Sequence, residues 1–317
     1  MCTLYLHIGH SKTGSSFLQA SFANSIEALE VQGFQYPVKR CKAAKDWKIS
    51  IGNGQALILE PPESHEITAK KVLFSAERMF GALARGPEFA HKLGAFAKFH
   101  RISRAEILMF LRDPVEHASS NYQQRVKRHG STNRIESTFV NYSTPERVRD
   151  VLKTRIPGVP IVWHVYNYER HKAELLDIAE RFLGVPNGTL ARGGGDPVNR
   201  SMTAGELVLL RALNKRLGQN ASAFADALCN EAPEVPAAAV YPPKQVQNRM
   251  LKRLADAIAE VNLQVDSIEG YRTEAKDPLP EKDGFVFTAH QLEVIADVFA
   301  TRLANLSAQL AVERARR

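Results

Sequence analysis

The run Gly9-His10-Ser11-Lys12-Thr13-Gly14-Ser15-Ser16 combines two glycines, four hydroxyl side chains and one lysine directly after an apolar stretch. Backbone N–H groups of such a turn, at the start of a helix, bind anions with help from the helix dipole. Nucleoside triphosphatases carry lysine directly after the second glycine, but Ser15 occupies that position here and the lysine is Lys12. The displaced lysine predicts an anion without a triphosphate chain. The alternative is a tight strand-to-helix turn that binds nothing.

A second group with possible chemistry is Leu111-Arg112-Asp113-Pro114, followed by Ser120. A guanidinium and a hydroxyl that converge on one point suit a phosphate monoester, which accepts several hydrogen bonds. The alternative is that Arg112 pairs with a neighbouring carboxylate and Ser120 is an ordinary helix residue. Asp113 is interpreted as the cap of the helix that follows, not as a metal-binding aspartate.

The elements that must position these residues alternate between apolar strands and amphipathic helices. This alternation predicts an α/β fold with a parallel sheet flanked by helices, in which ligands bind at the carboxyl ends of the strands. The predicted strands are Thr3 to Ile8, Lys71 to Ser75, Glu106 to Leu111 and Ile161 to Tyr166. The helices predicted between and after them are Ser16 to Val31, Glu88 to Phe99, Pro114 to Lys127 and Arg170 to Phe182.

The last third of the chain is rich in alanine and leucine and predicts a helical C-terminal extension. Its predicted helices are Thr203 to Leu217, Lys244 to Val265 and Thr288 to Gln309. We expect a single domain over residues 1–317, with an α/β nucleotide-binding core over 1–200 and the extension over 201–317. The extension as a separate domain is left open.

Composition narrows the class of protein and its partners. Three scattered cysteines, no apolar run of membrane-spanning length and no signal-peptide pattern predict a reduced, cytoplasmic protein without a transmembrane segment. The net charge of +8 favours anionic ligands. Its basic clusters lie at Lys39 to Lys48, at Arg125 to Arg128 and at the terminal Arg314, Arg316 and Arg317. No nucleic acid is expected as a partner, since no zinc-type spacing or RNA-binding aromatic motif occurs.

Taken together, these motifs resemble the sulfotransferases that use 3′-phosphoadenosine 5′-phosphosulfate (PAPS), in their bacterial and carbohydrate-acting style. The run from His7 to Ser16 is similar to the family's 5′-phosphosulfate-binding loop, and Leu111 to Ser120 is similar to its 3′-phosphate-binding motif. Val165-Tyr166-Asn167-Tyr168-Glu169 and Asn199-Arg200-Ser201-Met202 resemble two further segments of the family.

The resemblance implies a P-loop-like core, PAPS as sulfuryl donor, 3′-phosphoadenosine 5′-phosphate (PAP) as product and no metal requirement. The residues that it implies for the donor's 5′ end are Gly9, Ser11, Lys12, Thr13, Gly14, Ser15 and Ser16. Arg112 and Ser120 would hold the 3′-phosphate. Lys12 would also stabilise the charge that develops on the bridging oxygen.

The general base that deprotonates the acceptor is the least defined part of the site. Glu77 follows the second predicted strand, and the carbohydrate-acting branch places a catalytic glutamate in a comparable loop, so Glu77 is the first candidate. His10, inside the glycine-rich run, is the second. His7 alternates with apolar strand residues and is expected to be structural, whereas His117 is expected on an exposed helical turn.

Two other functions stay open from the residues. One is an atypical P-loop kinase or nucleoside triphosphatase, which the missing Gly-Lys-Ser/Thr disfavours. The other is a non-enzymatic polyanion-binding protein that uses the basic clusters. The acceptor would be a hydroxyl or amine on a carbohydrate, a lipid headgroup, a small metabolite or a peptide tyrosine, and no residue identifies which. The oligomeric state is equally open.

Overall fold

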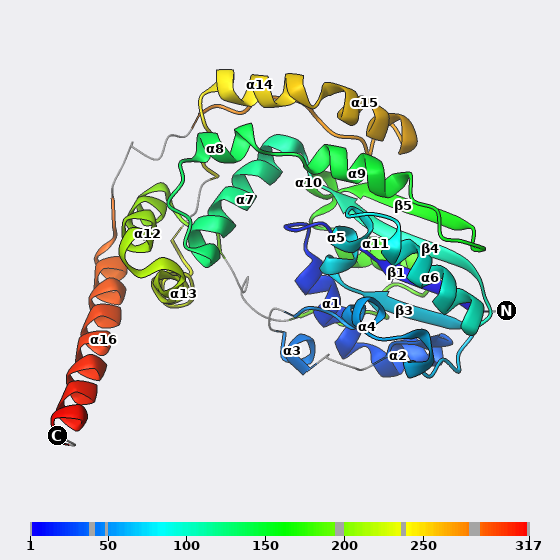
Figure 1. The fold of residues 1–317 in the computed structure, drawn as a ribbon, viewed down its shortest axis with the longest axis horizontal. Coiled ribbons are helices and arrows are strands. Elements are labelled where there is room, and N and C mark those ends of the chain that lie inside the picture. The colour runs from blue at the N-terminus through cyan, green and yellow to red at the C-terminus, as the bar shows by residue number, and fades with distance from the viewer. Residues whose placement is uncertain are drawn as a thin grey trace. The chain divides into compact units, whose positions relative to one another are not determined.

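The computed structural model describes residues 2–37, 42–47, 50–193, 200–235, 239–278 and 286–315. Its centre is a five-stranded, all-parallel sheet of strand order β2-β3-β1-β4-β5, flanked by helices (Figure 1). The predicted α/β class with a parallel sheet is therefore confirmed. The strands are β1 (Cys2–His7), β2 (Phe34–Gln35), β3 (Lys71–Ser75), β4 (Ile102–Leu111) and β5 (Ile161–Asn167).

Four of these strands match the predicted ones, and β2 is the strand that sequence missed. Its two residues are too few to show a periodic pattern. The strand β4 begins at Ile102, earlier than predicted, because the exposed Ser103 and Arg104 interrupt the apolar run without ending the strand. The central position of β1 places its carboxyl end between those of β3 and β4.

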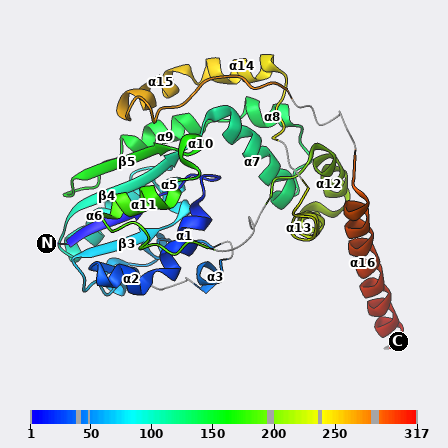
Figure 2. The same ribbon diagram turned by 180° about the vertical axis from the view of Figure 1, so that it is seen from behind.

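Alternate residues of the strands point to opposite faces of the sheet, and each face is covered by helices. On one face, Tyr5, Leu73 and Leu108 pack with buried residues of α1, α2 and α11. On the other face, the ring of Phe74 lies 5.9 Å from that of Phe96 on α6. Figure 2 shows the same layers from behind.

The chain divides into two compact units, each assembled from separate segments. The first unit contains the sheet and comprises Met1–Pro114, Ser143–Gly194 and Leu251–Thr273. Its helices are α1 (Ser15–Asn24), α2 (Ile26–Val31), α3 (Lys42–Lys45), α4 (Gln55–Leu59), α5 (Glu77–Leu83), α6 (Glu88–Phe99), α9 (Thr144–Leu152), α10 (Tyr168–His171), α11 (Leu175–Leu183) and α15 (Ala255–Gln264), with a 3₁₀ turn η1 (Pro62–Ser64).

The second unit is helical and comprises Val115–Tyr142, Gly195–Met250 and Glu274–Arg317. A buried ion pair between Arg200 and Glu206, 2.6 Å long, stabilises it, and Gln291 donates a further hydrogen bond to Glu206. The expectation of one domain over the whole chain stays a prediction. The helices are α7 (Pro114–His129), which begins at the last residue of the first unit, α8 (Ile135–Val140), α12 (Ala204–Leu217), α13 (Ser222–Glu231), α14 (Lys244–Arg253), which ends in the first unit, and α16 (Ala289–Ala315), with a 3₁₀ turn η2 (Gly218–Ala221).

Helix boundaries depart from the predictions mainly where a long predicted helix is broken. The helix predicted over Ser16 to Val31 breaks at Ser25, whose hydroxyl donates to the carbonyl of Ser21 at 2.7 Å and accepts from Ala191 N, also at 2.7 Å. A serine that bonds locally in this way competes with the helical backbone bonds. The helix predicted over Lys244 to Val265 likewise breaks, at Leu254. Among the described helices, none is both long and apolar enough to cross a membrane.

Candidate functional site

The glycine loop, Gly9 to Ser16, leaves the carboxyl end of the central strand and runs into α1. Lys12 has a φ of 66° and Gly14 a φ of 77°, so both adopt the left-handed conformation within three residues. Gly14 offers no side chain to cap α1. The first N–H groups of a helix have no partner inside it, so α1 presents unsatisfied donors at the carboxyl edge of the sheet.

Close packing explains both glycines of the loop. A Cβ on Gly9 would lie 1.9 Å from Ser15 Oγ, and a Cβ on Gly14 would lie 2.6 Å from Leu175 Cδ1. The hydroxyl of Ser15 is therefore folded back against Gly9. Ser15 is only 4% exposed, and its Oγ has no hydrogen-bond partner among the described residues. Thr13 differs, since its hydroxyl already donates to the carbonyl of His10 at 2.8 Å.

Arg112 follows β4 and reaches the glycine loop. Its Nη1 donates to the carbonyl of Lys12 at 3.0 Å, and its Nε donates to Glu169 Oε1 at 2.7 Å. The guanidinium also lies 5.4 Å from the ring centre of Tyr168. Three segments far apart in sequence thus meet at one edge of the sheet. One of the two predictions for Arg112, that it pairs with a carboxylate, is therefore confirmed. This ion pair uses only some of the N–H groups of the guanidinium.

A buried network holds this meeting point in place. Asn167 Nδ2 donates to Asp113 Oδ1 at 2.8 Å, and Asn167 Oδ1 accepts from Glu169 N at 3.0 Å. Asp113, expected to cap the next helix, also accepts from Arg272 N at 3.0 Å through the same oxygen. Glu269 Oε2 accepts from the backbone N–H of Asn167 at 2.7 Å. Sequence reasoning missed Glu269 and Arg272, since nothing in their pattern indicates a return to the sheet.

Glu77, the first candidate for the general base, is the first residue of α5 and is exposed to solvent. The protein around its carboxyl group raises its pKa by desolvation, while the positive charges of Lys12 and Arg78 act in the opposite direction. The charge of Lys12 in the glycine loop therefore acts on this carboxyl group. A carboxyl group with a raised pKa is a better proton acceptor than an ordinary glutamate.

His10, the second candidate, is 1% exposed. Its pKa is lowered to about 4, chiefly by burial; the hydrogen bond with the Ser11 backbone acts in the opposite direction, and the charges of Arg112 and Arg147 act in the same direction as burial. A group with so low a pKa is neutral at pH 7 and only a weak base.

The other two histidines of interest are structural. His7 Nδ1 lies 2.7 Å from Ser75 Oγ, and burial lowers its pKa to about 4, as expected of a strand residue that faces the core. The prediction for His117 is wrong: it is 1% exposed, and its Nδ1 lies 2.7 Å from the Tyr142 hydroxyl. Tyr142 lies beyond the end of α8, a helix that sequence did not predict.

Arg147 on α9 is a further residue that sequence reasoning missed. Its guanidinium lies 5.3 Å from the ring centre of Phe80, and that ring lies 5.6 Å from the imidazole of His10. The helix α9 was not predicted, so no pattern placed Arg147 near the loop.

Other predicted residues belong to the second unit or are not described. Ser120 belongs to the second unit, where it lies partly exposed on α7. Asn199 lies outside the described residues, as do Arg316, Arg317 and part of the cluster from Lys39 to Lys48.

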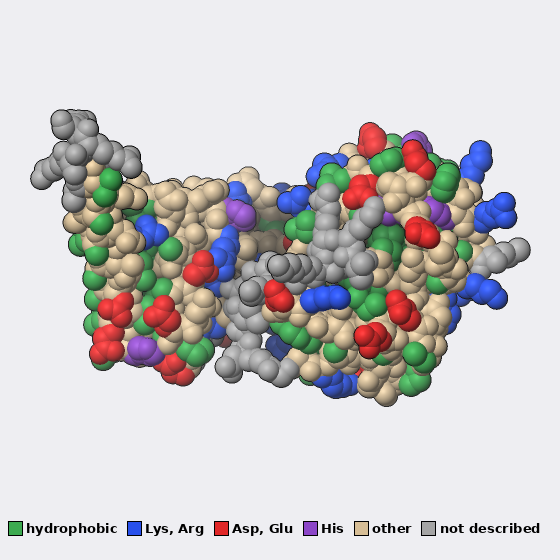
Figure 3. Space-filling view, turned by 90° about the horizontal axis from the view of Figure 1, so that it is seen from below, with side chains coloured by type: hydrophobic (Ala, Val, Ile, Leu, Met, Phe, Trp, Pro, Cys, Tyr) green, Lys and Arg blue, Asp and Glu red, His purple; other side chains and the backbone are tan. Residues whose placement is uncertain are grey.

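The basic residues do not gather on the face shown in Figure 3. There, Lys and Arg side chains are interspersed with Asp and Glu among the residues drawn in colour. Within the cluster from Arg125 to Arg128, Arg128 is paired with Asp226 at 2.5 Å. Among the residues drawn in colour, the charges on this face are therefore of both signs.

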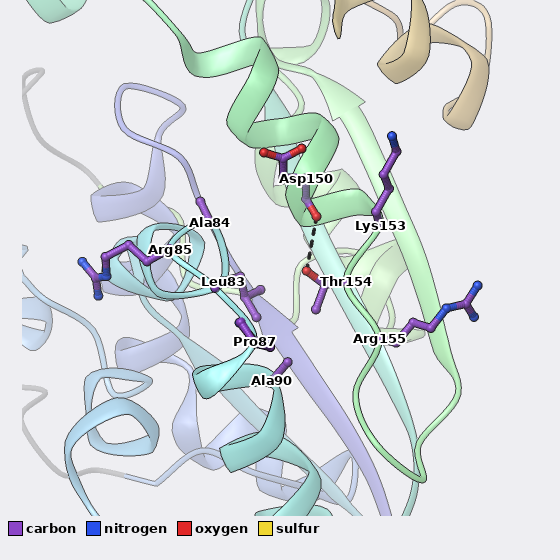
Figure 4. Close-up of a pocket in the computed structure, with 10 residues that line it drawn as sticks. Leu83, Ala84, Arg85, Pro87, Ala90, Asp150, Lys153, Thr154 and Arg155 are labelled. Carbon is purple, nitrogen blue, oxygen red and sulfur yellow. Dashed lines mark hydrogen bonds between the residues drawn. The ribbon is translucent and has the colours of Figure 1, made fainter.

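A surface hollow of about 510 Å³ lies between α5 and α9 (Figure 4). None of the residues that line it was predicted as a site residue. Within the described part of the chain, no three His, Cys, Asp or Glu side chains are grouped so that they could hold a metal ion. No family model matches this chain, and no curated protein matches it significantly.

Proposed function

We propose that this protein is a PAPS-dependent sulfotransferase built on a P-loop-like core. The observation that carries the proposal is the hydrogen bond from Arg112 Nη1 to the Lys12 carbonyl, 3.0 Å long. It joins two motifs that would bind opposite ends of one adenosine nucleotide, at the carboxyl ends of neighbouring strands. Such a ligand could bridge the two motifs only if the side chains of Lys12 and Arg112 open onto the same surface.

The glycine loop fits a singly attached anion. The unsatisfied N–H groups at the start of α1 and the buried, unpartnered hydroxyl of Ser15 are donors that require an acceptor. Ser16 would add a second hydroxyl, whereas Thr13 would contribute its backbone N–H because its hydroxyl is engaged. Gly9, Ser11 and Gly14 would contribute to the backbone of the loop that surrounds the anion.

Arg112 would bind the 3′-phosphate through the N–H groups that its contacts with Lys12 and Glu169 leave available. Glu169 and Tyr168 would hold the guanidinium in position before the ligand arrives.

The donor supplies an activated sulfuryl group on its 5′-phosphate. Lys12 would balance the negative charge that develops on the bridging oxygen, and a positioned group of this kind contributes about 3–4 kcal/mol to transition-state stabilisation. Sulfuryl transfer would resemble phosphoryl transfer, in which the attacking and leaving oxygens lie in line and catalysis depends mainly on positioning and electrostatic stabilisation. Glu77 would take the proton from the acceptor, because its raised pKa makes it a stronger base than His10.

A thermal-shift experiment tests donor recognition without knowledge of the acceptor. We expect adenosine 3′,5′-bisphosphate to stabilise the protein, because a ligand at a hundred times its Kd adds about 2.7 kcal/mol to the free energy of unfolding. Adenosine 5′-monophosphate and ATP, which lack the 3′-phosphate, should stabilise it much less. Equal shifts with all three nucleotides would indicate a generic anion site.

Turnover can be followed with water as acceptor, by the release of adenosine 3′,5′-bisphosphate from the donor. Lys12→Ala should slow this release by about a hundredfold or more, since Lys12 acts on the transition state. Arg112→Ala should instead weaken binding of the bisphosphate. Lys98→Ala, an exposed lysine on α6, is the matched control. Normal kinetics in both site variants would refute the proposal.

A further inference from the structure

Asn167, the last residue of β5, has its side-chain amide engaged on both sides. It is fully buried, and its Nδ2 donates to Asp113 Oδ1 at 2.8 Å and to the carbonyl of Gly270 at 3.1 Å. Its Oδ1 accepts from the backbone N–H of Glu169 at 3.0 Å. An amide has two N–H donors and one oxygen acceptor, so each of these groups has a partner here. An ionised aspartate, which has nearly the same shape, offers no donor.

The two carboxyl residues that contact Asn167 both adjoin Arg112. Asp113 follows Arg112 in the chain, so its hydrogen bond with Asn167 fixes the backbone where Arg112 leaves the sheet. Glu169 lies on α10, and its Oε1 accepts from Arg112 Nε at 2.7 Å. Asn167 therefore holds Arg112 twice, at its backbone through Asp113 and at its guanidinium through Glu169.

Asn167 is also the N-cap of α10, a single turn from Tyr168 to His171. So short a helix has little stability of its own and depends on its cap. Both groups of α10 that contact Arg112 belong to this turn: the carboxylate of Glu169 and the ring of Tyr168, whose centre lies 5.4 Å from the guanidinium. Loss of the cap would release both contacts at once.

The segment after α15 keeps the amide of Asn167 in one orientation. Its backbone supplies the carbonyl that accepts from Asn167 Nδ2 and, at Arg272, the N–H that donates to Asp113 Oδ1 at 3.0 Å. Asn262 on α15 holds this segment, since its Oδ1 accepts from Tyr271 N at 2.8 Å and its Nδ2 donates to the Tyr271 carbonyl at 3.2 Å. All of these residues belong to the first unit. Asn167 is thus fixed by three segments of one compact unit.

We propose that Asn167 is a positioning residue for the 3′-phosphate: it contacts no ligand itself but orients Arg112, and so determines how strongly the protein prefers a 3′-phosphorylated nucleotide. The proposal rests on the proposed function, in which Arg112 binds this phosphate. A guanidinium that is held in place before binding loses little conformational freedom when the phosphate arrives. Without Asn167, Arg112 would have to be ordered on binding, and its affinity for the phosphate would fall.

Isothermal titration calorimetry of the whole protein with adenosine 3′,5′-bisphosphate and with adenosine 5′-monophosphate tests this role. Asn167→Ala should weaken binding of the bisphosphate by about tenfold, the range of a hydrogen bond to a charged group. Binding of the monophosphate should change by less than about twofold, because it lacks the group that Arg112 binds. A purely structural loss would weaken both nucleotides equally and leave the ratio of their affinities unchanged.

A double-mutant cycle shows whether Asn167 acts through Arg112. In the Arg112→Ala background, Asn167→Ala should cause no further loss of affinity for the bisphosphate, because effects that pass through one group do not add. Asn167→Ser keeps an oxygen that can cap α10 but loses the donors to Asp113 and Gly270. Its affinity should lie between those of the wild type and Asn167→Ala, and it keeps the test available if Asn167→Ala does not fold. Thr203→Ala, which removes the cap of α12 in the second unit, is the matched control and should leave the affinity ratio unchanged.

The two proposals fail in different ways. If adenosine 3′,5′-bisphosphate does not bind the wild-type protein, or binds no more tightly than the monophosphate, the proposed function is lost. If the wild type prefers the bisphosphate but Asn167→Ala and Asn167→Ser keep that preference, the role of Asn167 is overturned while the donor site stands. The role is equally overturned if the losses caused by Asn167→Ala and Arg112→Ala add.

Discussion

At the scale of single residues, Lys12 shows how the fold supports a site. A left-handed backbone at a non-glycine residue costs about 1–2 kcal/mol, and Lys12 adopts it with a φ of 66°. The carbonyl of this residue accepts the hydrogen bond from Arg112. Backbone strain of this kind tends to persist at functional sites. The conformation of Lys12 therefore agrees with the functional role that we propose for it.

Glu77 gives a prediction in the pH dependence of turnover. Since the pKa of Glu77 is raised, chiefly by desolvation, we expect kcat/KM for donor hydrolysis to rise with pH through a value above that of an ordinary glutamate. Glu77→Gln should lower kcat/KM and abolish this rise. His10→Asn should keep it; a rise that disappears only in His10→Asn would make His10 the base.

The raised pKa of Glu77 also determines how this residue affects the free energy of unfolding at different pH values. A raised pKa means that the folded state favours the protonated carboxyl, so the stabilisation is present at low pH and is lost as the pH rises through the raised value. Glu77→Gln should therefore not lower the free energy of unfolding at pH 7. Because Glu77 is exposed, solvent screening keeps the effect small.

At the scale of elements, the turn Gly52-Asn53-Gly54 is held by hydrogen bonds to the last residue of β3, Ser75. Asn53 Oδ1 accepts from Ser75 N at 2.7 Å, and Gly54 N donates to the Ser75 carbonyl at 3.1 Å. A Cβ on Gly52 would lie 1.9 Å from that carbonyl oxygen, which is backbone and has no rotamer to change. The turn thus positions the strand end that leads to Glu77.

Gly52→Ala should therefore lower the free energy of unfolding by about 3 kcal/mol, more than the cost of the positive φ alone. Gly33→Ala is the matched control: Gly33 has a similar φ of 78°, but a Cβ there would meet nothing within 4 Å. Its cost should be about 1 kcal/mol. Urea unfolding of the two variants measures the difference, and equal costs would show that the contact with Ser75 is unimportant.

Much of the element order could be predicted, because buried parallel strands and amphipathic helices have strong periodic patterns. The convergence of the glycine loop with Arg112 followed from the rule on the carboxyl ends of parallel strands. The support from Glu269 and Arg272, and the approach of Arg147, could not be predicted. They come from long-range packing of segments such as α9, whose short amphipathic pattern does not indicate its neighbours.

At the scale of the whole molecule, two buried histidines should make the free energy of unfolding fall at acidic pH. His7 and His10 are 0% and 1% exposed, and burial lowers the pKa of each from 6.5 to about 4. Between these values the unfolded chain binds protons that the folded chain does not. Their contribution to stability is therefore present above about pH 6.5 and is lost as the pH falls towards 4, by up to about 3 kcal/mol for each histidine.

Urea unfolding between pH 7 and pH 4 tests this expectation. The free energy of unfolding of the wild type should fall over that interval, and His7→Asn should make the fall less steep. His129→Asn, an exposed residue at the end of α7, serves as the control. The same slope in His7→Asn and the wild type would contradict the expectation.

The segmented first unit also has a consequence for synthesis on the ribosome. The strands of the sheet are all translated by Asn167, yet the hydrogen bonds that Glu269 and Arg272 make with Asn167 and Asp113 come from a segment translated much later. Until that segment emerges, the nascent sheet keeps the amide and carboxylate beside Arg112 without those partners. The edge of the sheet that would recognise the nucleotide is therefore completed late in translation, after most of the second unit has been made.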